Sequence, residues 1–159
     1  MEYSELSSSF CKKFENKPVK RIKKDMLLYS IQEHHATRLH YDLRLEMDGK
    51  LKSWAIPKEP PTQANIKRLA VLTEVHPLAY YDFEGEIPFG YGAGKVKLWD
   101  IGYYRAESCS NTKIIIEIFG GRLKGRYALV KIKPREDKKN WLFFKLGYKY
   151  LKPHKSFSI

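Results

Sequence analysis

A run of alternating apolar and polar residues around one Asp-Gly pair places the strongest constraint on how this chain can fold. The run is LHYDLRLEMDGKLKSWAI, and Asp48-Gly49 divides it into two halves of strand-like composition. Asp-Gly tolerates the positive φ angles that a two-residue hairpin turn requires. Because a slip of one residue would exchange the two faces of a strand, the alternation also fixes the register, with Met47 opposite Lys50. The sequence therefore predicts a β-hairpin over residues 39–56.

The two faces of this hairpin differ in chemistry. One face is mainly apolar and is expected to face the core; it pairs Leu45 with Lys52, Leu43 with Trp54 and Tyr41 with Ile56. The other face is polar; it carries His40, Asp42, Arg44 and Glu46, with the small residues Ala55 and Ser53 opposite Asp42 and Arg44.

The rest of the chain continues this pattern. From Leu27 onward, short alternating runs are interrupted by glycine, proline and Asp-Gly, which is typical of an antiparallel sheet or barrel. Further strands are expected over residues 68–76, 95–99, 113–119, 127–133 and 141–146, and the glycine-rich stretch 84–94 indicates a loop or a bulged strand entry. We predict a mainly β protein, an antiparallel β-barrel with one or two short flanking helices.

Two regions are expected along the chain. Residues 1–26 are polar and lysine-rich, and we interpret them as a basic N-terminal arm, flexible or loosely docked, that could carry a short helix. Residues 27–159 are expected to form a single barrel domain, since the 159-residue chain has the size of one domain.

Charge and cysteine content narrow the class of protein. Lysine and arginine number 30 against 18 acidic residues, giving a net charge of +12 that favours a polyanionic partner. The two cysteines are far apart in sequence, which argues against a disulfide scaffold and favours a reducing compartment. No apolar run is long enough to cross a membrane and no secretory signal is evident. We expect a cytoplasmic protein, associated with the nucleoid and making no membrane contact.

The segment QEHHATRLHYDLRLE holds three histidines, an aspartate and two arginines. On a strand, His40, Asp42 and Arg44 project to the same face. An imidazole and a carboxylate can ligate a divalent cation, and the arginine can hold a phosphate oxygen beside it. His34 or His35, on the approach to the strand, could supply a third ligand. The alternative is a solvated polar face with incidental histidines.

Other candidates are less specific. Arg68 and His76 fall on one face of the strand expected over 68–76 and could line a phosphate site. Lys58, between Pro57 and Pro60-Pro61, lies on a stiffened strand exit. The C-terminal sequence KLGYKYLKPHK could stack bases and neutralise phosphates, or form a last strand with an exposed tail.

Several ordered motifs within residues 30–146 resemble one family. These are HHATRLHYDLRLEMDGKLKSWAIPK, RLAVLTEVHPLAYYDFEGEIP, YGAGKVKLWD and GRYALVKIK followed by NWLFFK. Together they are similar to the phosphoesterase domain of the bacterial ligase D proteins and its stand-alone relatives. The resemblance implies a β-barrel enzyme that heals 3′ ends by removing a terminal 3′ ribonucleoside or a 3′ phosphate. It implies Mn²⁺ as cofactor, with Co²⁺ or Zn²⁺ as other candidates.

The resemblance also implies roles for single residues. The metal ligands would be His34, His40 and Asp42. The phosphate-contacting and catalytic set would be Arg44, Lys58, Arg68 and His76, joined in the pocket by Gln32, Glu74 and Tyr80. His76 is the candidate to protonate the leaving group, because an unperturbed histidine titrates near neutral pH. The nucleophile stays open between metal-activated water, a histidine and a substrate 2′ hydroxyl.

Two departures from the family pattern are visible. The Arg-Asp-Phe and Thr-Pro-Glu-Pro signature of the family does not occur in CKKFENKPVKR, and the loop IPFGYGAG is one residue shorter than usual. The first puts any contribution of the arm to the site in doubt, and the second concerns the edge of the pocket.

Two other function classes remain possible from the residues. One is a non-catalytic nucleic-acid-binding module, and the other is a metal-independent phosphodiesterase that uses paired histidines as acid and base. The expected partners are DNA or RNA–DNA 3′ ends, with a separate ligase, polymerase and end-binding protein, and the expected state is a monomer. If Arg44 and His76 serve the substrate, alanine at either position should cripple turnover and leave stability nearly intact. A buried carboxylate as the partner of Arg44 would instead make its loss destabilising.

Overall fold

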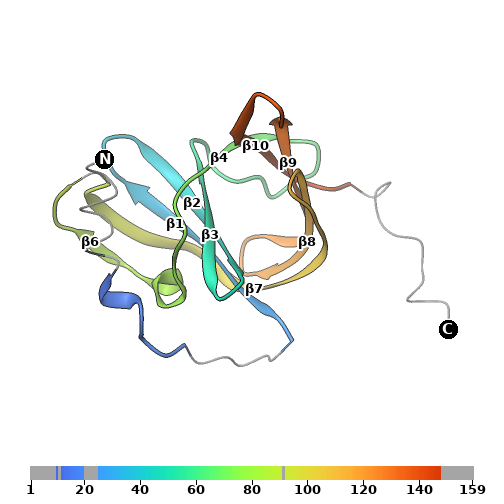
Figure 1. Ribbon diagram of the computed structural model, residues 1–159. Coiled ribbons are helices and arrows are strands. Elements are labelled where there is room, and N and C mark those ends of the chain that lie inside the picture. The colour runs from blue at the N-terminus through green and yellow to red at the C-terminus, as the bar shows by residue number, and fades with distance from the viewer. Residues whose placement is uncertain (1–9, 11, 20–24, 91, 148–159) are drawn as a thin grey trace.

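The structure is a computed structural model that describes residues 10, 12–19, 25–90 and 92–147 (Figure 1). Its strands are β1 (Leu27–His35), β2 (Leu39–Met47), β3 (Lys50–Ile56), β4 (Arg68–Leu72), β5 (His76–Pro77), β6 (Gly85–Ile87), β7 (Gly94–Cys109), β8 (Lys113–Gly120), β9 (Lys124–Lys133) and β10 (Asp137–Lys145). Two short 3-10 helices accompany them in the described residues, η1 (Lys12–Phe14) and η2 (Leu78–Asp82).

The β2–β3 hairpin has the turn and the register that the sequence predicts. Asp48 and Gly49 adopt φ angles of 51° and 79°, the positive values that a two-residue hairpin turn requires. The cross-strand pairs run from Met47–Lys50 to Tyr41–Ile56 without a shift. On the inward face of the hairpin Leu43, Leu45, Trp54 and Ile56 are fully buried, and Tyr41 and Lys52 are partly buried, so the predicted core face is confirmed.

Eight of the strands close into an antiparallel barrel. Their order is β1-β2-β3-β4-β10-β9-β8-β7, and β7 pairs back with β1. The short strands β5 and β6 attach to the outside of this ring, on β3 and β7. Figure 1 shows the strands curving around a common core, which is filled by inward side chains such as Tyr29, Trp54, Tyr104, Tyr127 and Trp141. The mainly β barrel with short flanking helices is therefore confirmed.

A second set of buried residues lies outside the barrel wall and is mainly polar, with Leu28 and Leu51 among it. Its polar members on β1, β2 and β3 are Ser30, Gln32, His34, Asp42, Arg44, Glu46 and Ser53. These outward side chains are covered because the segment from β5 through η2 to β6 folds back over them; His76 and Tyr80 of that segment are themselves buried. The polar face of the hairpin is thus covered by protein instead of being solvated. We call the covering segment, residues 76–87, the roof.

The structure corrects the strand expected over residues 68–76. β4 ends at Leu72, the Thr73 backbone N–H donates to the Ser53 carbonyl at 2.9 Å, and pairing resumes only at His76, on β3. Because the chain leaves the sheet between the two strands, the inference that Arg68 and His76 share one strand face is wrong.

Other differences concern strand extent. The approach to the hairpin, residues 27–35, is itself a strand, β1, with β2 and β7 as neighbours. The expected strand over 95–99 is the first third of the long β7, and β6 falls inside the expected loop 84–94. The division into an arm and a barrel domain stays a prediction, and residues 148–159 of the aromatic-basic C-terminus lie outside the described residues.

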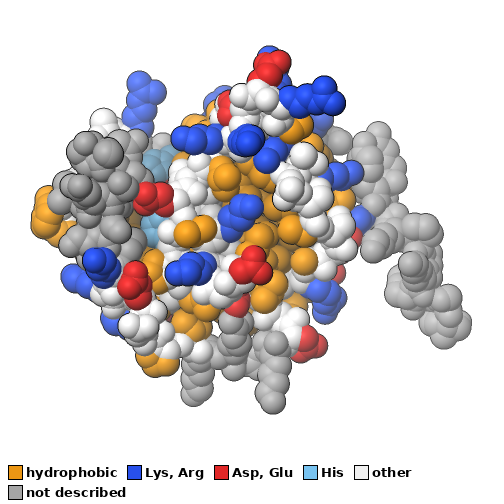
Figure 2. Space-filling model, in the orientation of Figure 1, with side chains coloured by type: hydrophobic (Ala, Val, Ile, Leu, Met, Phe, Trp, Pro, Cys, Tyr) orange, Lys and Arg blue, Asp and Glu red, His pale blue; other side chains and the backbone are white. Residues whose placement is uncertain are grey.

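The surface carries the excess of positive charge in a dispersed form. Figure 2 shows lysine and arginine side chains spread over the displayed face, with acidic and hydrophobic ones between them. Such a distribution produces a broad positive field that attracts phosphate backbones without specifying a sequence. No helix among the described residues is long and apolar enough to cross a membrane.

A buried carboxylate fastens the turn between β8 and β9 to β1. Asp100 accepts hydrogen bonds from the Tyr29 hydroxyl at 2.7 Å and from the backbone N–H groups of Gly121, Arg122 and Leu123 at 2.7–2.8 Å. The side chain therefore satisfies donors that would otherwise be buried or half-buried without a partner.

We expect Asp100→Ala to lower the free energy of unfolding by about 3 kcal/mol, because several donors lose their acceptor at once. Urea unfolding followed by circular dichroism measures the change. Glu136→Ala, which removes an exposed carboxylate from the β9–β10 turn, is the matched control and should shift the midpoint little. Equal midpoints for the two variants would contradict this account of the turn.

Candidate functional site

Strand pairing alone brings the histidines and the aspartate together. In the β1–β2 register His34 lies opposite His40, and Gln32 lies opposite Asp42. Facing residues in an antiparallel pair project to the same side of the sheet, so all four side chains enter the covered polar face. His35, opposite Leu39, projects to the other side, where its Nε2 lies 2.9 Å from the Glu33 carboxylate.

The proton of His34 is fixed by a backbone carbonyl. Nε2 of His34 lies 2.6 Å from the oxygen of Gly92, and because a carbonyl can only accept, Nε2 must be the protonated nitrogen. In the neutral imidazole the lone pair is then on Nδ1, which faces Oδ2 of Asp42 at 3.1 Å. The glycine-rich loop thus orients the imidazole from behind.

His40 has the same arrangement with its two nitrogens exchanged. Nδ1 donates to the carbonyl of Arg38 at 3.1 Å, which leaves the lone pair on Nε2, 3.3 Å from Oδ1 of Asp42. Each imidazole therefore directs a lone pair at a different oxygen of the same carboxylate, and the two rings lie 4.6 Å apart.

Three electron-pair donors that face one another repel unless positive charge lies between them. The ligand atoms of His34, His40 and Asp42 all lie within 4.8 Å of one another. One divalent cation placed between them would supply that charge. A carbonyl bonded to the remote nitrogen of each histidine is the usual support of a metal ligand. The donor set of two imidazoles and one carboxylate therefore fits a divalent transition metal.

The protonation of these groups reflects their crowding. Burial alone would raise the pKa of Asp42, but the Arg44 charge and the two histidine contacts lower it well below its usual range. Burial tends to lower the pKa of His40, and the hydrogen bond and charge of Asp42 outweigh it, so that this pKa is raised. Asp42 is thus an anion at every physiological pH.

Arg44 is the centre of the contacts around this triad. Its Nε donates to Oε1 of Gln32 at 2.8 Å, and Nη1 donates to Oγ of Ser53 at 2.9 Å. Nη2 lies 3.6 Å from Asp42, and Nη1 lies 3.2 Å from Nδ1 of His76. Since Arg44 is only 4% exposed, the guanidinium is a buried charge paired with a buried carboxylate.

His76 reaches this centre from β5. Its Nδ1 either accepts from Arg44 or donates to the Glu74 carbonyl, which lies at 3.0 Å. Burial first and the Arg44 charge second lower the pKa of His76 to about 3. The imidazole is therefore neutral near pH 7, and when Nδ1 accepts from Arg44, Nε2 carries the proton.

Tyr80 and Gln32 connect the roof to the site. The amide nitrogen of Gln32 donates to the carbonyls of Tyr80 and Phe83, at 2.9 and 3.1 Å. The Tyr80 ring lies 5.1 Å from the His76 ring, and the Arg44 guanidinium carbon lies 5.2 Å above it. The roof is thereby attached at both its backbone and its aromatic side chain.

Three of the residues expected at the site do not join this cluster. Lys58 and Glu74 are exposed, and Arg68 donates from Nε to the Glu59 carbonyl at 2.8 Å. No hydrogen bond or ion pair within the described residues links their side chains to the cluster. Lys58 follows Ile56, the partner of Tyr41, so it emerges at the same end of the hairpin as His40.

Sequence reasoning missed the residues that support the site. Ser53 was noted only for its small size, yet its hydroxyl accepts from Arg44. The carbonyl of Gly92 was not foreseen, although the glycine density of the loop was the available signal. A Cβ on Gly94 would lie 2.0 Å from the His35 carbonyl, so glycine there allows the loop to approach β1.

Comparisons with known proteins agree with this arrangement. Residues 32–131 match the model of a family described as the DNA ligase D 3′-phosphoesterase domain. The chain is 49% identical over 123 residues to a multifunctional non-homologous end joining protein, LigD, of Mycobacterium bovis, which covers 74% of this chain and 16% of that protein. It is 45% identical over 126 residues to the corresponding protein of Pseudomonas aeruginosa, covering 76% of this chain and 15% of that protein. The chain thus spans a small part of the length of these curated relatives.

The Arg44–Asp42 pair leads to a prediction about stability. Because the partner of Arg44 is a buried carboxylate, we expect Arg44→Ala to lower the free energy of unfolding of the metal-free protein by about 3–5 kcal/mol. Arg105→Ala is the control, since Arg105 pairs with Glu117 on the surface at 3.7 Å, and it should cost less than about 0.5 kcal/mol. Thermal melting of the two variants measures both losses of stability. Equal decreases in Tm for Arg44→Ala and Arg105→Ala would show that Arg44 has no structural role.

The pKa of His76 leads to a prediction about pH. The unfolded chain binds a proton at His76 below about pH 6.5, whereas the folded protein resists protonation until about pH 3, so acid favours unfolding. Between pH 7 and pH 5 this group should lower the stability of the metal-free wild type by about 2 kcal/mol. His76→Gln, which keeps an acceptor for Arg44, should lack that part of the decline. Denaturant melts at both pH values measure it, and parallel declines would refute it.

Proposed function

The chain belongs to the DNA ligase D 3′-phosphoesterase domain family, and we propose that it is a metal-dependent phosphoesterase acting on the 3′ ends of nucleic-acid strands. Its reactions would be removal of a 3′-terminal ribonucleoside, a diester cleavage, and removal of a 3′ phosphate, a monoester cleavage. The observation that carries the proposal is the convergence of two imidazole lone pairs on Asp42, beside the buried guanidinium of Arg44.

The residues that would hold the cation are His34, His40 and Asp42. Mn²⁺ is the metal we propose first, with Co²⁺ and Zn²⁺ as alternatives that accept the same nitrogen and oxygen donors. When bound, such a cation neutralises phosphate charge and polarises the ester towards attack. The carbonyls of Gly92 and Arg38 keep both imidazoles in the tautomers that ligation requires.

Arg44 would bind the phosphate next to the cation. Its Nε and Nη1 are occupied by Gln32 and Ser53, which fix the plane of the guanidinium before substrate arrives. The Nη2 edge lies along Asp42 and can donate to a phosphate oxygen beside the triad. A donor held in place in this way loses little entropy on binding and can stabilise charge that develops during the reaction.

His76 would act as a neutral hydrogen-bond donor. With Nδ1 accepting from Arg44, the proton on Nε2 is available to a substrate oxygen. A pKa near 3 means that the free protein does not present a preformed imidazolium, so transfer of a proton to the leaving group would need the phosphate charge to raise that pKa first. Tyr80 would hold the imidazole in place through its ring.

The exposed candidates would serve the outer part of the substrate. Lys58, at the His40 end of the hairpin, and Arg68 would meet phosphates that flank the reacting one, and Glu74 would contact the substrate edge. Polymerase and ligase steps on the healed end, and recognition of the broken end, would be carried out by components outside residues 1–159. A DNA-end substrate would place this activity with the nucleoid.

The test is a 5′-labelled primer–template whose primer ends in one ribonucleotide, incubated with and without Mn²⁺. We expect a shortened product bearing a 3′ phosphate, then a 3′ hydroxyl, and neither in chelator. His34→Ala should reduce the rate more than about 100-fold, because it removes a ligand. His35→Ala is the matched control, since it changes the adjacent histidine on the other side of the sheet.

Each competing class predicts a different pattern in this assay. Full activity in chelator would favour the metal-independent histidine mechanism and overturn the metal assignment. Binding of the primer–template without any product would favour a non-catalytic nucleic-acid-binding module. Equal losses in the two histidine variants would refute His34 as a ligand.

A further inference from the structure

The described part of the N-terminal segment packs against the roof of the site through aromatic rings. The Phe14 ring lies 5.0 Å from that of Tyr80 and 5.7 Å from that of Phe83. Phe10 adds contacts of 6.5 Å to Tyr80 and 5.7 Å to Phe83. All four contacts have steep interplanar angles of 75–88°, the edge-to-face arrangement that aromatic pairs prefer.

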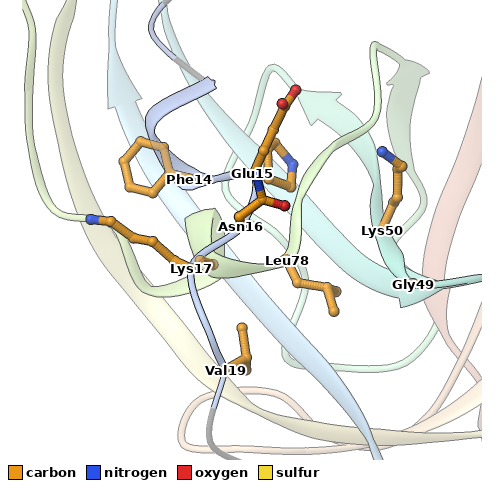
Figure 3. A pocket seen from close by; sticks show the side chains of 10 residues that line it. Phe14, Glu15, Asn16, Lys17, Val19, Gly49, Lys50 and Leu78 are labelled. Atoms are coloured by element: carbon orange, nitrogen blue, oxygen red, sulfur yellow. The ribbon is translucent and has the colours of Figure 1, made fainter.

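The N-terminal segment touches the rest of the protein over a small area. Two hollows of about 420 and 450 Å³ flank Phe14, and the first also borders Lys50 and Leu78. In Figure 3 the stretch from Phe14 to Val19 runs along one side of this first hollow and Lys50 lies on the other side, with Leu78 between them. η1 itself contains no buried residue. The segment is therefore held to the barrel chiefly by its phenyl rings.

Lysines cover the outward sides of those rings. Nζ of Lys13 lies 4.8 Å from the Phe10 ring centre, and Nζ of Lys17 lies 5.1 Å from that of Phe14. Such cation–π contacts let the segment keep its phenyl rings on η2 while the charged groups stay in water. The basic composition of the segment is thus compatible with apolar docking.

The ring that Phe14 touches is the one that touches the site. Tyr80 is 2% exposed, and its ring contacts Phe14 as well as His76 and Arg44. The Tyr80 ring is also stacked on the Phe83 ring, at 5.1 Å and 17°. Gln32 holds the backbone carbonyls of both residues, and Phe14 packs against both of their rings. Phe14 lies outside the residues 32–131 that match the family.

We propose that Phe14, supported by Phe10, is a positioning residue that holds the Tyr80 ring against His76 and Arg44. The claim that this position matters for turnover rests on the proposed function, whereas the positioning itself does not. Phe14 acts through Tyr80 and touches no substrate. The segment before the barrel thereby becomes part of the working site by packing alone.

The experiment compares Phe14→Ala with Phe119→Ala and Phe14→Tyr in the full chain, metal-free for the spectroscopic readout because paramagnetic Mn²⁺ broadens nearby proton signals, and loaded with Mn²⁺ for the kinetic one. Phe119 is the matched control, because it is a half-exposed phenylalanine on β8 with the Arg105 guanidinium 5.4 Å from its ring. The first readout needs no activity: the His76 ring protons, assigned by their loss in His76→Gln, carry a ring-current shift from Tyr80. We expect Phe14→Ala to move these signals, and Phe119→Ala to leave them in place.

The second readout is kinetic. Misplacement of His76 and Arg44 should lower kcat of Phe14→Ala by about 10- to 100-fold, with a much smaller change in KM. Phe14→Tyr, which keeps an aromatic edge, should restore both readouts. In the Tyr80→Leu background Phe14→Ala should add little, because the ring through which it acts is gone.

The outcomes separate the positioning role from its alternatives. Unmoved His76 signals in Phe14→Ala overturn the proposal, whatever the rates. Moved His76 signals in Phe14→Ala, together with a wild type that lacks phosphoesterase activity, would support the positioning role and refute only the proposed function. A kcat loss explained by weaker Mn²⁺ binding or by a lower Tm, with no rescue by tyrosine, would reduce Phe14 to a structural residue and also overturn the proposal.

Discussion

The buried guanidinium of Arg44 is the interaction on which the site and its cover both depend. A charge with 4% exposure is costly unless its N–H groups and its charge are all compensated, and here the compensation comes from four elements: β1, β2, β3 and β5. Gln32, which accepts from Arg44, also donates to the carbonyl of Tyr80 in η2 and to that of Phe83 directly after it. One side chain therefore ties the strands that carry the ligands to the segment that covers them.

That cover changes the chemistry of the polar face. In water, two imidazoles and a carboxylate would be screened and separately hydrated. In the folded protein His34 and Asp42 are buried and His40 is partly buried, so their mutual repulsion and the attraction of a cation are both strengthened. The Gly92 carbonyl behind His34 and the Arg38 carbonyl beside His40 then decide which nitrogens face Asp42. The barrel supplies a stiff base for this cluster, because its interior is filled by large side chains from the same strands.

Some elements could be foreseen and others could not, for reasons that differ by residue. The turn at Asp48-Gly49 and the pairing from Met47 to Tyr41 are local, since a two-residue turn determines which residues face each other. The break between Leu72 and His76 could not be foreseen, because Thr73 to Val75 suit a strand as well as the residues around them do. It is this break that brings His76 to Arg44. Arg68 stays with β4 and bonds the Glu59 carbonyl.

The sequence by itself determined that this is a basic β protein and that His40, Asp42 and Arg44 share one face, because side chains alternate along a strand whatever the strand packs against. Tertiary structure decided which distant groups meet that face. His34 enters it and His35 does not because β1 pairs with β2 in one register, and His76, Tyr80 and Gly92 arrive from segments far along the chain. Alternation sets the side to which a residue points, whereas its neighbours across the sheet and above it depend on how the whole barrel closes.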